Sequence, residues 1–122
     1  PGRGLSETAS RFDTYLSWMA VACDRGALRP LVEIGIDAIE AHDLALAGRF
    51  RSGITDLGLP TDEYPEAERS PIVAVTIHDA GAAVERLSRA GVVVAQRANG
   101  VRFSFHVFNN ESDVYLALAA PE

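Results

Sequence analysis

Apolar residues recur at helical spacing between residues 36 and 57, which gives the clearest element of the chain. The recurring positions are Ile36, Ile39, Leu46, Phe50, Ile54 and Leu57. Such spacing predicts one long amphipathic helix. Gly58 and Pro60 follow, as is usual beyond a helix C-terminus. The polar, acidic residues 59–69 are then typical of a linker.

The next stretch predicts a strand followed by a helix. Residues 72–77 are β-branched and mostly apolar, which favours a strand buried on both faces. A helix is expected over residues 80–90, because Asp79 is a good N-cap and Gly91 is a good C-terminal stop.

Two more strands are predicted at residues 92–96 and 101–107. The turn between them contains Asn99 and Gly100, a pair that suits a positive φ in a hairpin. A last helix is expected over 111–120, capped by Asn110 and with Asp113 at the capping-box position.

The first 35 residues follow a less regular pattern. Aromatic and apolar side chains crowd together at Phe12, Tyr15, Leu16, Trp18, Met19, Val21 and Ala22. Arg25-Gly26 interrupts this run, and Pro30 suits the first turn of a short helix that ends near Gly35. This segment has little core of its own, so we expect it to need a partner surface.

Together these patterns predict an α/β (α+β) fold with a small three-stranded sheet of βαββα order, packed by helices. A long helix and an N-terminal interface arm precede it. The expected divisions are residues 1–35 for the arm, 36–58 for the linking helix and 59–122 for the small domain.

Composition excludes several classes of function. The formal net charge of −6 disfavours nucleic-acid binding, and no apolar run is long enough to predict a membrane span. A single cysteine excludes an internal disulfide, so a reduced, cytoplasmic setting is expected. All 11 basic residues are arginine. Without lysine, no side chain of this sequence can form a Schiff base.

Arg102 is the strongest candidate for a binding residue. On a strand, Arg102, Ser104 and His106 share one face. The opposite face carries Phe103, Phe105 and Val107 and is expected to pack on the last helix. An arginine held on a rigid strand is well suited to bind a carboxylate through two parallel hydrogen bonds. The polar face is either the solvated side of the sheet or one wall of a ligand cleft completed by another segment.

The other candidate functional residues, which are His106, Cys23 and Trp18, have weaker support from the sequence. His106 could act as a general base or a metal ligand, but His42 and His78 are isolated in sequence, so a structural role is favoured and no metal site is predicted. Cys23 lies in the apolar segment and is expected to be buried or interfacial. Trp18 is either a core residue or one that projects into a cofactor site across a subunit boundary.

Three segments, in order, resemble one enzyme family. Val101–Val114 has an Arg, then Ser, then an aromatic-Asn-polar corner before Asp-Val. Arg11-Phe12-Asp13 resembles an Arg-Phe-acidic element, and residues 33–42 resemble the start of a long interdomain helix. These features are similar to the class V branch of fold-type-I pyridoxal phosphate enzymes. That branch includes cysteine desulfurases, selenocysteine lyases, kynureninases and isopenicillin N epimerases.

The resemblance implies roles for particular residues. Arg102 would bind the α-carboxylate of an amino-acid substrate, while His106 and Asn109 would support the strand-to-helix corner. Arg11, Thr14 and Trp18 would lie near the cofactor of the partner subunit in a homodimer. No residue of this chain is expected to be catalytic. The family often has Gly-Thr after the acidic residue, but here Thr14 follows Asp13 directly, which puts its phosphate contact in doubt.

The resemblance also implies an incomplete enzyme. The Schiff-base lysine, the aspartate on the pyridine nitrogen and the large-domain sheet would precede residue 1. We therefore expect a C-terminal fragment of a pyridoxal-phosphate-dependent lyase, desulfurase, epimerase or aminotransferase, inactive alone, rather than a natural split subunit. The alternatives are a stand-alone α/β ligand-binding or regulatory module and an oligomerisation domain that uses the aromatic arm.

Overall fold

The computed structural model describes residues 17–120. They divide into two compact units, with the break between Ile34 and Gly35. Each unit is described by itself.

The first unit contains helix α1, which runs without interruption over Trp18–Ile34. Ser17 caps it, since its hydroxyl accepts a hydrogen bond from the Ala20 backbone N–H at 3.3 Å. The predicted break at Arg25-Gly26 is therefore wrong, and Pro30 lies inside the helix instead of starting a short one. Proline costs that turn one backbone hydrogen bond. None of the residues of α1 is buried in the described part of the chain.

Helix α2 spans Ile36–Asp56 and confirms the long helix predicted from the apolar spacing. Gly35, with φ 88°, precedes it, and Gly58, with φ 73°, lies just beyond its end. Both values are in the left-handed region that glycine adopts at little cost. One stripe of α2 is buried: Ile39, Asp43, Leu46, Ala47, Phe50 and Ile54.

The remaining elements follow the predicted order β-α-β-β-α. They are a short 3-10 turn η2 (Glu66–Glu68), then β1 (Ile72–Thr76), α3 (Ala80–Arg89), β2 (Ala95–Arg97), β3 (Gly100–Ser104) and α4 (Glu111–Ala119). The strands form one antiparallel sheet with β3 in the centre, in the order β1-β3-β2. The predicted α/β fold is confirmed.

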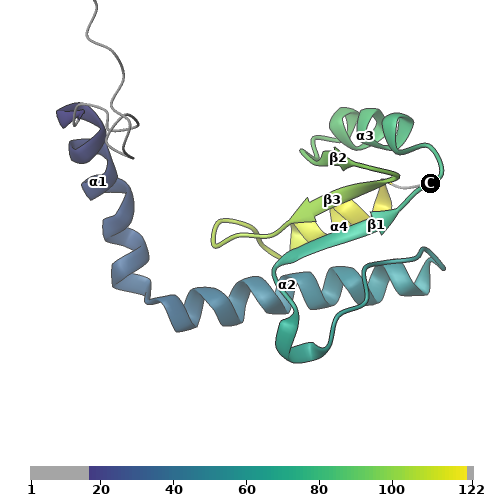
Figure 1. The fold of residues 1–122 in the computed structure, drawn as a ribbon, viewed down its shortest axis with the longest axis horizontal. Coiled ribbons are helices and arrows are strands. Elements are labelled where there is room, and N and C mark those ends of the chain that lie inside the picture. Colours follow the sequence, from purple (N-terminus) through teal and green to yellow (C-terminus); the bar gives the residue numbers. More distant parts are fainter. Residues whose placement is uncertain (1–16, 121–122) are drawn as a thin grey trace, which may run out of the picture. The chain divides into compact units, whose positions relative to one another are not determined.

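The helices cover only one face of this sheet (Figure 1). Val73 and Val75 of β1 are buried and their neighbours in the strand are exposed, so the prediction that this strand is buried on both faces is wrong. Pairing in register places Val101 and Phe103 of β3 on the same buried face. Helices α2, α3 and α4 all contribute to that core.

An aromatic cluster holds the sheet against α2. The ring of Phe50, which is 0% exposed, lies 4.4 Å from the ring of Phe103 and 5.4 Å from that of Phe105, centroid to centroid. The predicted aromatic face of β3 is thus buried, as expected. Its aromatic partner comes from α2, while α4 adds Val114 and Ala117 to the same core.

Two strand boundaries differ from the prediction. Strand β2 begins at Ala95 and not at Val92, because the Val92 backbone N–H donates to the Leu87 carbonyl at 2.8 Å and so closes the end of α3. Strand β3 ends at Ser104, because the chain turns tightly at residues 106–109. The hairpin turn has its positive φ at Ala98 (46°) and not at Asn99 or Gly100.

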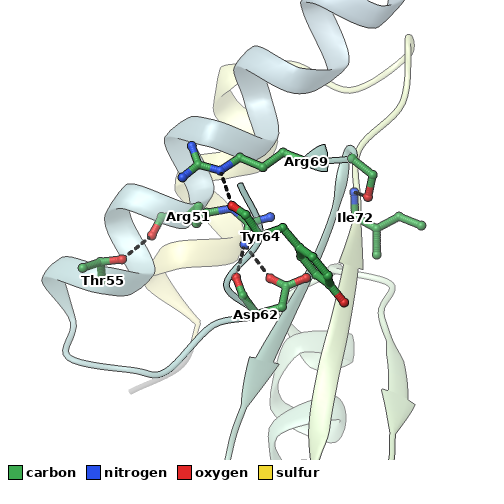
Figure 2. Close-up of polar contacts among 7 residues, drawn as sticks. Arg51, Thr55, Asp62, Tyr64, Arg69 and Ile72 are labelled. Carbon is green, nitrogen blue, oxygen red and sulfur yellow. Dashed lines mark hydrogen bonds and ion pairs between the residues drawn. The ribbon is translucent and has the colours of Figure 1, made fainter. Parts of the chain in front are cut away.

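The predicted linker is tied to both α2 and the sheet (Figure 2). The Arg51 guanidinium forms an ion pair with the Asp62 carboxylate and donates to the Asp62 carbonyl at 2.8 Å. The Asp62 backbone N–H donates to the Ala74 carbonyl on β1 at 3.0 Å. A further bond, from the Arg69 Nε to the Tyr64 carbonyl at 3.4 Å, folds the linker on itself.

Candidate substrate-binding face

The sheet leaves one face uncovered by the helices of its unit, and we call it the open face. Its residues are those that alternate with the buried ones: Ile72, Ala74, Thr76, Ala95, Arg97, Gly100, Arg102 and Ser104. Small side chains dominate this face. Two of its residues are charged, and both are arginines.

Arg102 lies at the middle of the open face. It is on the central strand, and its Cα partners are Ala74 on β1 and Ala95 on β2. Because both neighbours are alanine, no bulky side chain from either adjacent strand stands beside it in this row. The residue is partly buried. Antiparallel pairing on both sides of β3 fixes the backbone from which this side chain projects.

One atom of the Arg102 guanidinium stands out. Its Nε is buried and has no hydrogen-bond acceptor within the described residues. A buried donor left unsatisfied costs about 1–3 kcal/mol, so an acceptor that reached this group would recover that cost. Planar, bidentate anions such as carboxylates match the arginine fork best.

His106 lies just beyond the end of β3 and is exposed. Its Nδ1 accepts a hydrogen bond from the Val107 backbone N–H at 2.9 Å, so the neutral ring carries its proton on Nε2. The ring also stacks on Phe108, with centroids 5.1 Å apart. In this state His106 presents a donor, and the nitrogen that a general base would use is already engaged.

Asn109 holds the corner between β3 and α4 from two sides. Its side-chain oxygen accepts from the His106 backbone N–H at 2.9 Å, and its amide nitrogen donates to Asp113 at 3.2 Å. His42 on α2 donates to the Asn109 carbonyl at 3.0 Å. These bonds join the corner to two helices.

The start of α4 has the predicted capping box. The Asn110 side chain accepts from the Ser112 backbone N–H at 2.8 Å, and Asp113 accepts from the Asn110 backbone N–H at 2.9 Å. The predicted N-cap at Asn110 and the capping-box position of Asp113 are confirmed.

The other predicted residues either belong to the first unit or lie outside the described residues. Arg11 and Thr14 lie outside the described residues. Trp18 begins α1, in the first unit, and is 74% exposed. Cys23 on α1 is exposed too, so the expectation that this thiol is buried within the chain is wrong.

A groove of about 420 Å³ opens beside the end of β3. It lies between residues 91–94 and 103–105, next to Phe108 and Leu116. Ser104 of the open face also lines this groove, but Phe103, Phe105 and Ala117 in the lining belong to the core on the helix-covered side of the sheet. Its walls are mostly apolar, because valine and phenylalanine side chains dominate the lining.

Residues 17–120 contain neither a metal-ligand cluster nor a membrane-spanning helix. No group of three His, Cys, Asp or Glu side chains there could hold a metal ion. None of the helices in that range is long and apolar enough to cross a membrane.

Comparisons with known proteins give one match of fold. No protein-family model and no curated protein matches the sequence. Among solved structures, the chain is similar to the apo form of a cysteine desulfurase from Thermococcus onnurineus NA1, with a TM-score of 0.77 and 23% sequence identity. The match covers 97% of this chain but 34% of the desulfurase. The chain therefore has the fold of about one third of a cysteine desulfurase.

Proposed function

We propose that this chain forms the small domain and an interface segment of a pyridoxal-phosphate-dependent enzyme that acts on an amino acid. The observation that carries the proposal is Arg102, which stands on the open face with an unpartnered, buried Nε. The fold likeness to a cysteine desulfurase over 97% of the chain supports it. So does the sequence pattern of Val101–Val114, which resembles the closing motif of the class V family.

In this proposal Arg102 anchors the α-carboxylate of the substrate. A two-pronged ion pair fixes both the position and the plane of the carboxylate. Fixing that plane orients the bonds at the substrate Cα, which is how a binding residue accelerates a reaction without taking part in bond breaking. Desulfuration, elimination, epimerisation and transamination of an amino acid all require this orientation, so Arg102 would serve any of them.

The cofactor would be held by another part of the enzyme. Pyridoxal phosphate acts as an electron sink for reactions at the substrate Cα, and it is attached through a lysine amine. The sequence given contains no lysine, so its own residues do not make the attachment site. Its contribution is one wall of the substrate site.

His106 and Asn109 would support that wall indirectly. Asn109 links the corner to Asp113, and His42 links it to α2. These bonds limit how far the end of β3 can shift, and Arg102 lies on that strand. We place both residues in a positioning role and not a catalytic one.

The exposed apolar surface of α1 supports a partner for the first unit. Trp18, Met19 and Val32 are 74%, 77% and 78% exposed. Apolar exposure on this scale is typical of a surface that another protein covers. We propose that this partner is the large domain and a second subunit of a homodimer, with Arg11, Thr14 and Trp18 near the second subunit's cofactor. A cytoplasmic setting remains part of the proposal.

The test uses the complete enzyme encoded with this chain. The coding sequence before Pro1 should specify a large domain with a Schiff-base lysine. In that enzyme, Arg102→Ala should weaken substrate binding by about 2–4 kcal/mol, as expected when one partner of a desolvated charge pair is lost. Steady-state kinetics would show this as a raised KM, with the visible absorbance of the bound cofactor unchanged.

Arg89→Ala is the matched control, because Arg89 is exposed on α3 and away from the sheet. Unchanged kinetics in Arg102→Ala would reject the role of Arg102. A natural start codon directly before Pro1, with no companion gene for a large domain, would reject the enzyme.

A further inference from the structure

The open face holds a second arginine that the proposed function does not use. Arg97 on β2 pairs in register with Gly100, one position along the face from the row that contains Arg102. It is therefore a diagonal cross-strand neighbour of Arg102, and Cα atoms in such pairs are about 7–8 Å apart. Side chains as long as arginine meet easily across that distance.

Within residues 17–120, Arg25, Arg69, Arg86, Arg97 and Arg102 have no carboxylate partner, and of these Arg97 and Arg102 lie on the open face. Arg29, Arg49, Arg51 and Arg89 each pair with a carboxylate. Within the described residues Arg97 donates only to the Gln96 backbone carbonyl, at 3.0 Å. The sequence has 17 acidic residues and a net charge of −6, yet none of the residues that the three strands supply to the open face is acidic.

Gly100 pairs with Arg97, in the row next to that of Arg102. It is buried, and an added Cβ would lie too close to the Val75 carbonyl oxygen, which is backbone and cannot move aside cheaply. The position therefore stays without a side chain, so none stands opposite Arg97 on β3.

We propose that Arg97 and Arg102 together bind a dianionic substrate, namely an amino acid with an acidic side chain. Arg102 takes the α-carboxylate and Arg97 takes the second anionic group. The proposal rests on the proposed function, since it extends the same site. Its physical basis is that two neighbouring cations repel each other, and a ligand with two negative charges relieves that repulsion while it satisfies the Arg102 Nε.

The groove beside Ser104 offers the competing arrangement. It lies beside the end of β3, the strand that carries Arg102, and is lined mostly by apolar side chains. A substrate whose side chain entered this groove would be apolar, with leucine as a simple probe. With the α-carboxylate bound to Arg102 in both cases, Arg97 predicts a preference for an acidic substrate side chain, and the groove predicts a preference for an apolar one.

The experiment is an NMR titration of the full 122-residue chain, labelled with ¹⁵N, at fixed pH and ionic strength. The probes are L-aspartate, L-asparagine as its neutral isostere, and L-leucine. Binding is followed through the arginine Nε–H signals. We expect aspartate to shift the signals of both arginines and to bind about fivefold more tightly than asparagine, the upper range for an exposed ion pair.

Two variants separate this inference from the proposed function. Arg97→Gln should bring aspartate binding down to the level of asparagine and leave asparagine unchanged. Arg102→Gln should weaken both. Arg89→Gln, on the exposed surface of α3, should change neither. Backbone amide spectra show whether each variant keeps the fold.

The outcomes that overturn the two proposals are different. An unchanged ratio of aspartate to asparagine affinity in Arg97→Gln, or tighter binding of leucine than of aspartate, rejects the dianion site and leaves the role of Arg102 standing. Full binding of both probes by Arg102→Gln rejects the carboxylate anchor itself. If none of the probes shifts either arginine signal in the unaltered chain, the dianion site is rejected.

Discussion

Helix α1 and the unit that follows it differ in how they are stabilised. Both contain long helices with many apolar residues. In α2, six residues are buried and the ring of Phe50 packs against those of Phe103 and Phe105. In α1, which is fully described, no residue is buried although Trp18, Val32 and others are apolar. The difference shows that apolar content makes a core only where a second surface is supplied.

The largest expected difference between the two regions is in the effect of truncating an apolar side chain in α2 or in α1. Phe50→Ala should destabilise residues 35–122 by about 3–5 kcal/mol, because a fully buried aromatic leaves a cavity. Leu28→Ala on α1 removes a side chain that is 55% exposed, and it should change stability by less than about 0.5 kcal/mol. Urea denaturation followed by circular dichroism measures both. Equal effects of the two truncations would show that α1 shares the core.

A smaller test uses two ion pairs. Arg51 and Asp62 are 12% and 20% exposed, whereas Arg29 and Glu33 on α1 are 80% and 63% exposed. Arg51→Ala should cost about 2 kcal/mol, because it removes hydrogen bonds to a charged and a backbone acceptor that are partly buried. Arg29→Ala should cost about 0.3–0.5 kcal/mol at most.

The same urea titrations measure the ion-pair variants, and high salt sharpens the contrast. Salt screens exposed pairs more than buried ones, so the effect of Arg29→Ala should vanish in salt and that of Arg51→Ala should persist. An Arg51→Ala variant as stable as the original would mean that the linker is not held by this pair.

The smallest test concerns helix formation itself. Pro30→Ala should raise the helical content of α1, since proline is the least favourable residue in a helix interior. The urea midpoint of residues 35–122 should not move. Gly48→Ala is the counterpart on α2, where an added Cβ meets nothing within 4 Å, and it should stabilise that unit by about 0.5–1 kcal/mol. A shift of the midpoint by Pro30→Ala would break the separation of the two units.

Much of the second unit could be predicted from local pattern. The positions of α2, α3 and α4 follow from apolar spacing and capping residues. The capping box at Asn110 is predicted by the three-residue spacing between Asn110 and Asp113. The alternation along β3 also placed Arg102 opposite the buried aromatics. These features depend on neighbours in sequence, which a single sequence contains.

The errors came from features that depend on distant partners. The apolar run of β1 looked buried on both faces, but helices of this unit cover only one of them. The hairpin that pairs β2 with β3 was predicted, but its first strand was expected to end at residue 96, before Arg97. The observed strand Ala95–Arg97 and its register place Arg97 beside Arg102. Register depends on the partner strand, so Arg97 was missed.

The position of Trp18 has a practical consequence for spectroscopy. It is the single tryptophan of the sequence and lies on α1, 74% exposed, while the core of residues 35–122 contains none. Its fluorescence therefore reports on the surroundings of α1. A blue shift on addition of a protein partner would record docking of α1. The chain thus carries a native optical probe of the surface that needs a partner.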